Sequence, residues 1–444
     1  MCRSHARERS VSKNRGNDTM KTLKVSIILL VFLLAAMMMV PMVSAIEQST
    51  VIASPNQTNA STIDVSKIQL PQLIYDKNQT PIVMNDEMSL DPNIQSTQIA
   101  RMVEGASNPA ISKIPFGAII HHSIDGITTV FDSTGKQLFT ADDSKAGLVS
   151  TFKGRVPATH VQEVPDKSVI YDMGNVLYVF SNNMLILTVT DDSISGKNSA
   201  LTASSSSTIS PQWIEWGSTN AIPTAVGQFI SQWNVPTKPT LTKSLVIGSV
   251  YYDSSLEIWN GLENDPSLLQ PVLEWYMKDG YQIPSPSTPQ WTMATWYVWG
   301  SGNSFIHSTR TSGIYSGDQM QGNIQLNTLG YDGIASITDL GNQGGGSSTL
   351  FLAKSSAPIR MPTTNLQAEI VLEGWDPTTP LGGLNSQYLC GPITFQSFVL
   401  KDSNGNNLIS NYPMSGYYNT NYWNPSTYGL SISNLWPTSI TLGT

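Results

Sequence analysis

The stretch LQAEIVLEGW, residues 366–375, shows the two-residue period of a β-strand. Small or apolar residues at 368, 370 and 372 alternate with Glu369, Val371 and Glu373. Successive side chains of a strand point to opposite faces, so Glu369, Val371 and Glu373 are predicted to share one face. Two carboxylates on either side of a valine fit a polar groove, and they fit an exposed sheet surface equally well.

The rest of the C-terminal half repeats this strand pattern. All eleven Trp residues follow residue 212, with many Gly and Pro between short runs of β-branched and aromatic residues. No amphipathic helix of ordinary length interrupts these runs. The sequence therefore predicts an all-β fold, with residues 212–444 as a sandwich of two antiparallel sheets.

The N-terminal half divides into three segments. Residues 46 to about 112 are a polar arm, and the region from Gly117 to Asp192 is a small β-rich unit with Asp-Gly, Thr-Gly, Gly-Asn and Asn-Asn turns. The stretch SISGKNSALTASSSSTISP, residues 193–211, is small, polar and aperiodic, which is typical of a linker. The expected division is a signal region at 1–45, an N-terminal unit at 46–192, a linker at 193–211 and a sandwich at 212–444.

The N-terminus predicts export. From Met20, two lysines precede an apolar run and the small-residue sequence Val43-Ser44-Ala45, the order found in a cleaved signal peptide. The alternative is a retained membrane anchor, but the run is shorter than the roughly 20 residues that span a bilayer. We expect a secreted or cell-surface protein without stable membrane insertion after cleavage.

Charge and cysteine content exclude several classes of function. The formal net charge of −8 becomes more negative once the basic leader is removed, so a nucleic-acid partner is not expected. Cys2 belongs to the leader and leaves Cys390 without an internal disulfide partner. Three Asn-x-Ser/Thr triplets at residues 56–58, 59–61 and 78–80 predict a glycoprotein.

The common catalytic motifs are missing from residues 212–444. Only His307 is a histidine there, so a His-based zinc site or a Ser-His-Asp triad is not expected. His121 and His122 follow one another on a predicted strand, so one should point inward and one outward as structural residues. Cys390 is interpreted as a packed small residue. Neither a metal nor a cofactor is predicted.

Gln270 lies within the apolar sequence Leu-Leu-Gln-Pro-Val-Leu, residues 268–273. A primary amide is costly to bury without a partner, and Pro271 beside it removes a backbone donor. Gln270 is therefore either a structural amide that holds a loop or a side chain that faces a ligand.

Seven segments, in order, resemble the glutamic peptidases (eqolisins). They are FISQWNVP (229–236), IWNGLENDPSLLQPVLEW (258–275), WTMATWYVW (291–299), IYSGDQMQGNIQL (314–326), AEIVLEGW (368–375), CGPITFQSFVLKDSNGNNL (390–408) and YGLSISNLW (428–436). The resemblance covers about residues 225–440 and implies a concanavalin A-like sandwich of two curved antiparallel sheets. It also implies an active groove on the concave face and an N-terminal prosegment, here residues 46–192, that is removed on activation.

The resemblance implies that Gln270 and Glu373 are the catalytic residues of an acid-acting endopeptidase. Glu373 would accept a proton from the attacking water, and the Gln270 amide would stabilise the oxyanion. The substrate is then a polypeptide, and the substrate-binding residues expected around the pair are Trp233, Trp259, Trp296, Tyr297 and Glu369.

Three positions depart from the family pattern: Val298 replaces a usual Glu, Pro271 replaces a small or polar residue, and Ile370 replaces a Trp. These departures leave a second hypothesis open. A non-catalytic surface lectin or adhesion module could bind glycan through Trp259, Trp296 and Trp299, because the same fold hosts both functions. The two hypotheses differ in whether a Gln–Glu pair converges in one groove.

Overall fold

The computed structural model describes residues 71–75, 81–85, 100–103, 111–146, 148–151, 154–194, 213–241, 244–247, 250–253, 255–264, 267–275, 290–299, 304–328, 330–341, 346–354, 361, 363–375, 389–420 and 425–443. All of them belong to one unit, Thr62–Thr444. The predicted signal region, the three glycosylation triplets and most of the predicted linker lie outside the described residues.

A nine-stranded sheet carries the strand on which the sequence argument began, β26. Its order is β10-β21-β20-β19-β18-β26-β14-β28, with β22 paired to β20. The strands are β10 (Val161–Val164), β14 (Trp213–Thr219), β18 (Ser255–Asn264), β19 (Ser267–Trp275), β20 (Trp291–Trp299), β21 (Ser304–Ser308), β22 (Thr311–Ile314), β26 (Gln367–Trp375) and β28 (Met414–Tyr418).

A thirteen-stranded sheet forms the other layer, in the order β29-β30-β27-β15-β23-β24-β25-β11-β12-β13-β5-β6-β7. Its strands are β5 (Ala118–His122), β6 (Ile127–Phe131), β7 (Gln137–Asp142), β11 (Ser168–Asp172), β12 (Val176–Ser181), β13 (Met184–Asp191), β15 (Val226–Asn234), β23 (Gln319–Thr328), β24 (Tyr331–Asp339), β25 (Ser347–Ala353), β27 (Ile393–Asp402), β29 (Ser433–Leu435) and β30 (Ser439–Leu442).

Short elements complete the described chain. Four two-stranded sheets pair β1 (Pro71–Tyr75) with β2 (Pro81–Asn85), β3 (Ala100–Val103) with β4 (Ile111–Ile114), β8 (Leu148–Thr151) with β9 (Gly154–Pro157), and β16 (Ser244–Ile247) with β17 (Val250–Asp253). The helical segments are η2 (Asp143–Lys145), η3 (Ala158–His160), η4 (Asp192–Ile194) and the four-residue α2 (Pro425–Tyr428). None of the described helices is long and apolar enough to cross a membrane.

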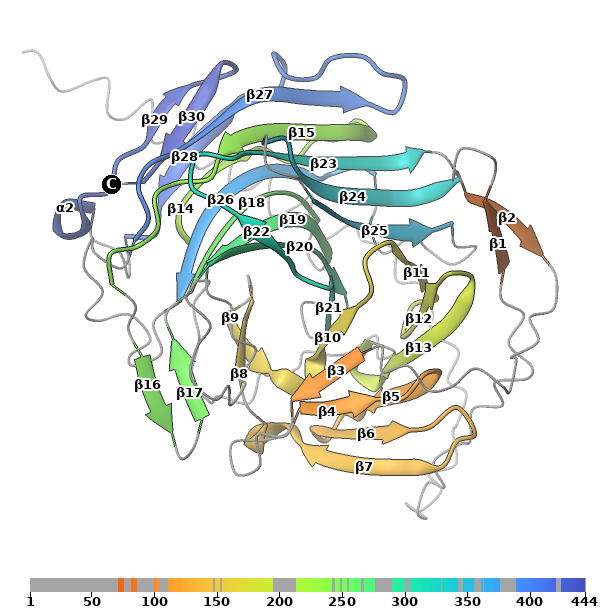
Figure 1. The fold of residues 1–444 in the computed structure, drawn as a ribbon. Coiled ribbons are helices and arrows are strands. Elements are labelled where there is room, and N and C mark those ends of the chain that lie inside the picture. Colours follow the sequence, from red (N-terminus) through yellow and green to blue (C-terminus); the bar gives the residue numbers. More distant parts are fainter. Residues whose placement is uncertain are drawn as a thin grey trace, which may run out of the picture. The chain divides into compact units, whose positions relative to one another are not determined.

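The two large sheets pack face to face as a β-sandwich, which confirms the predicted fold class (Figure 1). The strands of the nine-stranded sheet are curved, and their concave side faces away from the packed strands β15, β23, β24 and β25 (Figure 1). One continuous hydrophobic cluster fills the space between the layers, with Phe229 and Ile324 from one sheet and Leu269 and Leu372 from the other.

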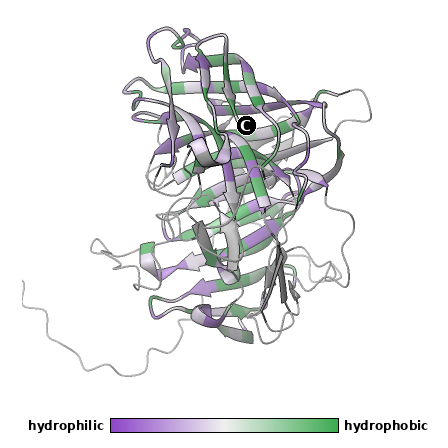
Figure 2. Cartoon of the chain, turned by 90° about the vertical axis from the view of Figure 1, so that its left-hand side faces the viewer, coloured by the Kyte–Doolittle hydropathy of each residue, from purple (hydrophilic) through white to green (hydrophobic). Residues whose placement is uncertain are grey.

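Burial distinguishes the two sheets. In β23 and β24 buried and half-buried residues alternate, as expected when one face packs on a core and the other faces water. Figure 2 shows hydrophobic and hydrophilic residues alternating along strands of the chain. All nine residues of β19 are buried, and so are all but one of β20. The centre of the nine-stranded sheet is therefore covered on both faces.

A close approach between the sheets depends on Gly322 of β23. The Asn260 side chain of β18 points into the core and donates from Nδ2 to the Gly322 carbonyl at 3.4 Å. A Cβ atom on Gly322 would lie 1.7 Å from Asn260 Oδ1, so only glycine fits there.

The N-terminal β-rich unit continues both large sheets. β10 pairs in parallel with β21, and β11 pairs in parallel with β25. The turns within this unit match the sequence prediction, since Asn182 and Asn183 both have positive φ in the tight connection from β12 to β13. Parallel pairing between strands more than a hundred residues apart was not predictable from these local patterns.

Candidate functional site

The concave face of the nine-stranded sheet carries four buried glutamates. The alternation of β18, β19 and β26 places the following side chains on this face: Glu257, Gln270, Glu274, Glu369 and Glu373. The intervening residues of the same strands point into the core between the sheets. The sequence prediction that Glu369 and Glu373 share a face is therefore correct, and that face is buried rather than exposed.

Gln270 and Glu369 lie level with one another across a glycine. In the β18–β26 pairing, Gly261 is opposite Glu369. In the β18–β19 pairing, Trp259 is opposite Val272 and Leu262 is opposite Leu269, which puts Gly261 level with Gln270. The two side chains are on strands about 10 Å apart, with Gly261 between them and the Trp259 ring and Leu268 packed over that glycine.

The register separates Gln270 from Glu373. Glu373 is opposite Glu257. It lies four residues from Glu369 along β26, which corresponds to about 13 Å. The expected catalytic pair of Gln270 and Glu373 is thus separated both by β18, which lies between β19 and β26, and by this distance along β26. The residue that the structure brings beside Gln270 is Glu369.

Gly261 must be a glycine for packing reasons as well. A Cβ atom there would lie 2.7 Å from Trp259 Cζ3 and 2.9 Å from Leu268 Cδ1. Such contacts are not tolerated without movement of the indole ring. The Trp259 ring and the Leu268 side chain therefore cover Gly261 at the level of Gln270 and Glu369.

Pro271 interrupts the backbone pairing beside Gln270. The backbone pairing between β18 and β19 is interrupted at Asn260 and Gly261. Pro271 lacks the backbone N–H that a hydrogen bond at this position would need. Across the other edge of β19, the Thr295 N–H donates to Ser308 Oγ at 3.0 Å. Pro271 is therefore a local break in the sheet at the level of the Gln270 side chain.

Burial shapes the chemistry of the pair. Gln270 is 1% exposed, and its Oε1 is a buried acceptor without a hydrogen-bond partner among the described residues. Glu369 is 3% exposed and accepts a hydrogen bond from Ser218 Oγ of β14 at 3.2 Å. An amide oxygen that is buried without a partner is costly, which is common where a ligand or water completes the site.

Glu373 belongs to a row of three carboxylates. Glu257 of β18 lies directly between Glu373 of β26 and Glu274 of β19. Trp259 Nε1 donates to Glu373 Oε2 at 3.3 Å. Burial raises the pKa of Glu373 to about 8, and the Trp259 hydrogen bond offsets only part of this rise. Glu373 is therefore a neutral carboxylic acid at acidic pH.

Glu274 is the charged end of this row. Arg310 Nε donates to Glu274 Oε2 at 2.5 Å, and Trp296 Nε1 donates to Glu274 Oε1 at 2.7 Å. The Arg310 guanidinium also lies 5.8 Å from the centre of a Trp296 ring and 4.0 Å from Glu163 of β10. Sequence analysis missed Glu257, Glu274 and Arg310, although the alternation in LEIWNGLEN already places Glu257 on the face of Trp259 and Gly261.

The four aromatic residues predicted to bind substrate are distributed over both faces. Trp259 and Trp296 lie on the concave face, where their N–H groups hold Glu373 and Glu274. Trp233 of β15 packs on Phe395 in the core between the sheets. Tyr297 also lies in that core and donates to Asp172 Oδ2 at 2.9 Å. The structure therefore keeps Trp233 and Tyr297 away from Gln270.

The three departures from the family pattern fall in different places. Ile370 points into the core and has no contact with the concave face. Val298 is opposite Leu268, one row beyond Gln270 on the concave face, within a fully buried apolar cluster that also holds Phe305. Pro271 directly follows Gln270 in the chain, as Ile370 follows Glu369.

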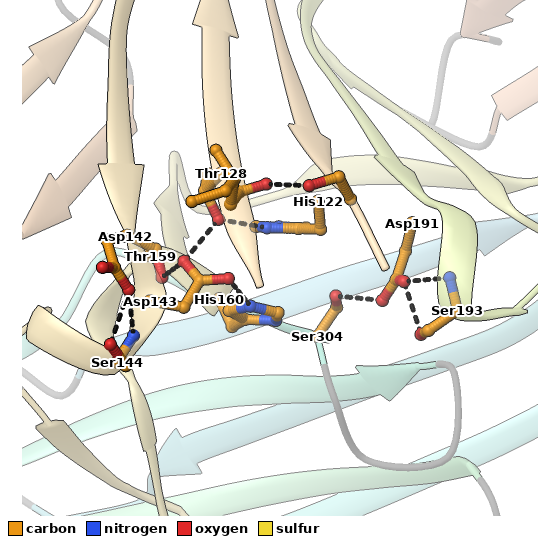
Figure 3. Close-up of polar contacts among 12 residues, drawn as sticks. His122, Thr128, Asp142, Asp143, Ser144, Thr159, His160, Asp191, Ser193 and Ser304 are labelled. Atoms are coloured by element: carbon orange, nitrogen blue, oxygen red, sulfur yellow. Dashed lines mark hydrogen bonds and ion pairs between the residues drawn. The ribbon is translucent and has the colours of Figure 1, made fainter. Parts of the chain in front are cut away.

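A second polar cluster lies in the N-terminal unit (Figure 3). Asp143 Oδ1 accepts from the hydroxyls of Thr128 and Thr159, both at 2.7 Å, and Asp143 Oδ2 lies 3.0 Å from His160 Nε2. His122 Nδ1 is 2.8 Å from Thr128 Oγ1. Because that hydroxyl gives its proton to Asp143, His122 Nδ1 is the donor and His122 Nε2 carries a bare lone pair.

The ligand atoms of His122, Asp143 and His160 lie within 4.8 Å of one another, close enough to be considered for a metal. The two imidazole rings, however, are stacked with centroids 4.1 Å apart and planes 18° from parallel. Imidazole lone pairs lie in the ring plane, so those of stacked rings run side by side rather than converge on one ion. The cluster is a hydrogen-bonded network that joins η2 and η3 to β5 and β6, with His122 structural as predicted.

No protein-family model matches the chain, and no curated protein sequence matches it. Among solved structures, the chain is similar to that of SCP-B, a member of the eqolisin family of peptidases, in a complex with the tripeptide Ala-Ile-His. The match has 17% sequence identity and a TM-score of 0.30, and it covers 52% of this chain and 98% of that chain. It is a weak resemblance at the level of the fold.

Proposed function

We propose that the chain is a glutamic-type endopeptidase in which Gln270 and Glu369 act together on a peptide bond. The observation that supports this proposal is their position on either side of Gly261, on one face and at one level of the sheet. The Trp259 ring and Leu268 cover that glycine, so a water molecule and a peptide carbonyl would enter between the two side chains only once these groups have moved.

The mechanism follows from the chemistry of the two groups. Ionised Glu369 accepts a proton from water as the water oxygen attacks the peptide carbonyl carbon. The Gln270 amide donates a hydrogen bond to the developing oxyanion, an interaction worth about 3 kcal/mol for one donor. Protonated Glu369 then returns its proton to the nitrogen as the C–N bond breaks, and an acid and an amine leave.

Glu373 is less suited to the role of base. Burial raises its pKa to about 8, so at acidic pH it already holds the proton that a base must accept. Its distance along β26 also separates it from the Gln270 amide. In this proposal Glu373 acts as a neutral partner of Trp259 and supports the wall of the site.

The full-length chain is expected to be latent. A peptide cannot reach Gln270 and Glu369 while both are almost fully buried. We therefore retain residues 46–192 as a prosegment and residues 1–45 as the signal region of a secreted or cell-surface protein. Release of the prosegment would have to separate β10 from β21 and β11 from β25.

The glycan-binding alternative has less support. Trp259 and Trp296 are fully buried, and Trp299 points into the core, where its Nε1 donates to the Gly174 carbonyl at 3.0 Å. None of the three presents an indole face to solvent for a sugar to stack on.

Digestion of denatured casein by the full-length chain, after incubation at about pH 4, tests the proposal. Glu369→Gln should abolish hydrolysis, and Gln270→Ala should slow it by about 10²- to 10³-fold, as for a lost oxyanion donor. Glu373→Gln is the matched control on the same strand and should retain most of the activity. Loss of activity in Glu373→Gln with full activity in Glu369→Gln would assign the base to Glu373 instead, and equal rates for all variants would reject the function.

A further inference from the structure

Two rows of apolar side chains flank Gln270 on the concave face. Leu268 and Val272 are two residues away from Gln270 in either direction along β19, so they share its face. In each row, the members are directly opposite one another on neighbouring strands. The first row is Leu268, Val298 and Phe305, and the second row is Val371, Trp259, Val272 and Ala294. Every member of both rows is fully buried.

The N-terminal unit adds residues to this apolar surface. Val161 of β10 is opposite Phe305 and extends the first row by one strand. Val156 of β9 and Ala158 of η3 precede β10 in the chain and pack in the same cluster as the two rows. Ala158 has no exposed surface, and Val156 is half-buried. The segment Val156–Ala158, which we call the plug, therefore packs on the apolar rows that flank Gln270.

The plug also restrains the side chains that cover Gly261. Trp259 and Leu268 pack over this glycine and belong to the same apolar cluster as the plug. In a closely packed cluster, one side chain cannot move far unless its neighbours move as well. The plug therefore helps to hold the Trp259 ring and Leu268 in the positions that close the space between Gln270 and Glu369.

Hydrogen bonds to Asp143 fix the chain directly after the plug (Figure 3). The Thr159 hydroxyl donates to Asp143 Oδ1 at 2.7 Å, and His160 Nε2 lies 3.0 Å from Asp143 Oδ2. Gln162 Nε2 donates to the Thr159 carbonyl at 2.7 Å. Thr159 and Asp143 are buried, where a hydrogen bond is stronger than in water. The polar cluster around Asp143 therefore anchors the plug on the concave face.

We propose that the plug is an internal inhibitor that occupies an apolar subsite of the groove, and that a peptide with small aliphatic side chains takes its place after displacement. Val156 and Ala158 are themselves small and aliphatic, and the rows on which they pack are apolar. Burial of apolar surface would drive the binding of plug and peptide alike. The inhibition rests on the proposed function, whereas the occupation of the groove does not.

Chemical labelling of the full-length protein measures whether the groove is closed. Val298→Cys places a thiol in the first apolar row, and its reaction with iodoacetamide is followed by mass spectrometry at about pH 8, near the ordinary pKa of a thiol. Addition of Val156→Asp, which puts a charge into the apolar cluster, should make this thiol react about tenfold faster. Addition of Ile124→Asp, the matched change at an exposed position of the N-terminal unit, should leave the rate unchanged.

Two further measurements separate opening of the groove from unfolding. Cys390 is buried in the core between the sheets, so it should stay unlabelled in every folded variant. Thr159→Val keeps the side-chain volume and removes one hydrogen bond to Asp143, so it should give a labelling rate between those of Val156→Asp and the parent. If Val156→Asp exposes Cys390, Thr159→Val carries the test.

A peptide that copies residues 156–161, Ac-Val-Pro-Ala-Thr-His-Val-NH₂, tests the class of ligand. Added to the full-length protein with Val156→Asp, it should protect the introduced thiol and slow casein hydrolysis. Its analogue with aspartate in place of the first valine should need about tenfold higher concentration for the same protection. Equal protection by both peptides would reject the aliphatic subsite.

The two readouts distinguish the inhibitor from the peptidase. Casein hydrolysis by intact Val156→Asp protein about tenfold faster than by the intact parent, together with faster labelling, supports both proposals. Faster labelling without hydrolysis by any variant keeps the plug in the groove and rejects the peptidase. Parent-like labelling of Val156→Asp and Thr159→Val, with Cys390 unlabelled and casein still hydrolysed, rejects the plug and keeps the peptidase.

Discussion

Gly261 sets the geometry of the candidate site through the absence of its side chain. Because there is no Cβ at this position, the Trp259 ring and Leu268 pack directly over the backbone between Gln270 and Glu369. At the same scale, Glu369 and Glu373 have the same residue type and face but different surroundings. Ser218 donates a hydrogen bond to Glu369, whereas Trp259 donates one to Glu373, whose pKa is raised by burial to about 8.

Glu373→Gln is predicted to change the pH dependence of stability. Burial raises the pKa of Glu373 from its ordinary value of 4.5 to about 8. Between these values the unfolded chain has released the proton and the folded chain has kept it, so the free energy of unfolding falls as pH rises. The variant, neutral at every pH, should be more stable than the parent by up to about 3 kcal/mol at pH 7 and equally stable near pH 4. Urea unfolding at both pH values measures this, and a stability difference that is the same at both would contradict it.

At the scale of elements, side chains from β20 and β21 connect the sandwich to the N-terminal unit. Tyr297 and Trp299 donate to Asp172 and the Gly174 carbonyl, and Ser304 Oγ donates to Asp191 at 3.2 Å, as Figure 3 shows for the last pair. β10 adds to the edge of β21 through backbone hydrogen bonds. Arg310 strengthens this junction because it lies between Glu163 of β10 and Glu274 of β19.

Arg310→Ala is predicted to destabilise the fold by about 3–5 kcal/mol, because it leaves the buried Glu274 carboxylate without its cation. The double variant Arg310→Met/Glu274→Leu should recover most of the loss, since it removes both charges and keeps the volume apolar. Lys145→Ala, which breaks the exposed ion pair with Asp142, is the control and should leave the unfolding midpoint nearly unchanged. An unfolding midpoint of Arg310→Ala equal to that of Lys145→Ala would show that the buried pair contributes no more than the exposed one.

At the scale of the whole molecule, the buried Glu373 and Glu215 of the sandwich and the buried His122 of the N-terminal unit respond to acid in opposite directions. Burial raises the pKa values of Glu373 and Glu215 to about 8, so these residues make the sandwich more stable as pH falls from about 8 toward their ordinary value of 4.5. In the N-terminal unit, burial lowers the pKa of His122 well below 6.5, and the neighbouring His160 and His121 lower it further. Below about pH 6.5 the unfolded chain binds a proton at His122 that the folded chain does not bind. The N-terminal unit therefore loses stability as pH falls below about 6.5.

Acidification from about pH 7 to about pH 5 is therefore predicted to loosen residues 111–194 before residues 213–443. Hydrogen-exchange protection factors, corrected for the intrinsic exchange rate at each pH, measure this difference. His122→Phe keeps a ring to stack on His160 and removes the titration, so it should remove most of the pH dependence in the N-terminal unit. His121→Asn on the same strand should retain it. The groups facing His122 are Thr128, Asp143, His160 and His121. Equal changes in protection across both regions would contradict the opposite responses.

The sequence by itself determined the strands, their turns and the face on which each side chain lies. A two-residue period is a local property, so alternation around Glu369 and Glu373 is enough to place both carboxylates on one face, and Asn182-Asn183 is enough to place a turn. The same patterns identified Gln270 as an unusual amide and indicated that one of His121 and His122 faces inward. They also predicted the sandwich, because half-buried strands without helices have few other ways to cover their apolar faces.

Only the tertiary structure decided which carboxylate stands beside Gln270. That choice depends on the register of β18 against β26, strands that are about a hundred residues apart in the chain, and a local pattern contains no information on how such strands align. Long-range pairing also decided that Trp233 and Tyr297 lie in the core, that Arg310 meets Glu274, and that β10 and β11 join the two large sheets. Alternation along one strand gives the direction of a side chain, whereas its neighbours are set by strands that only folding brings together.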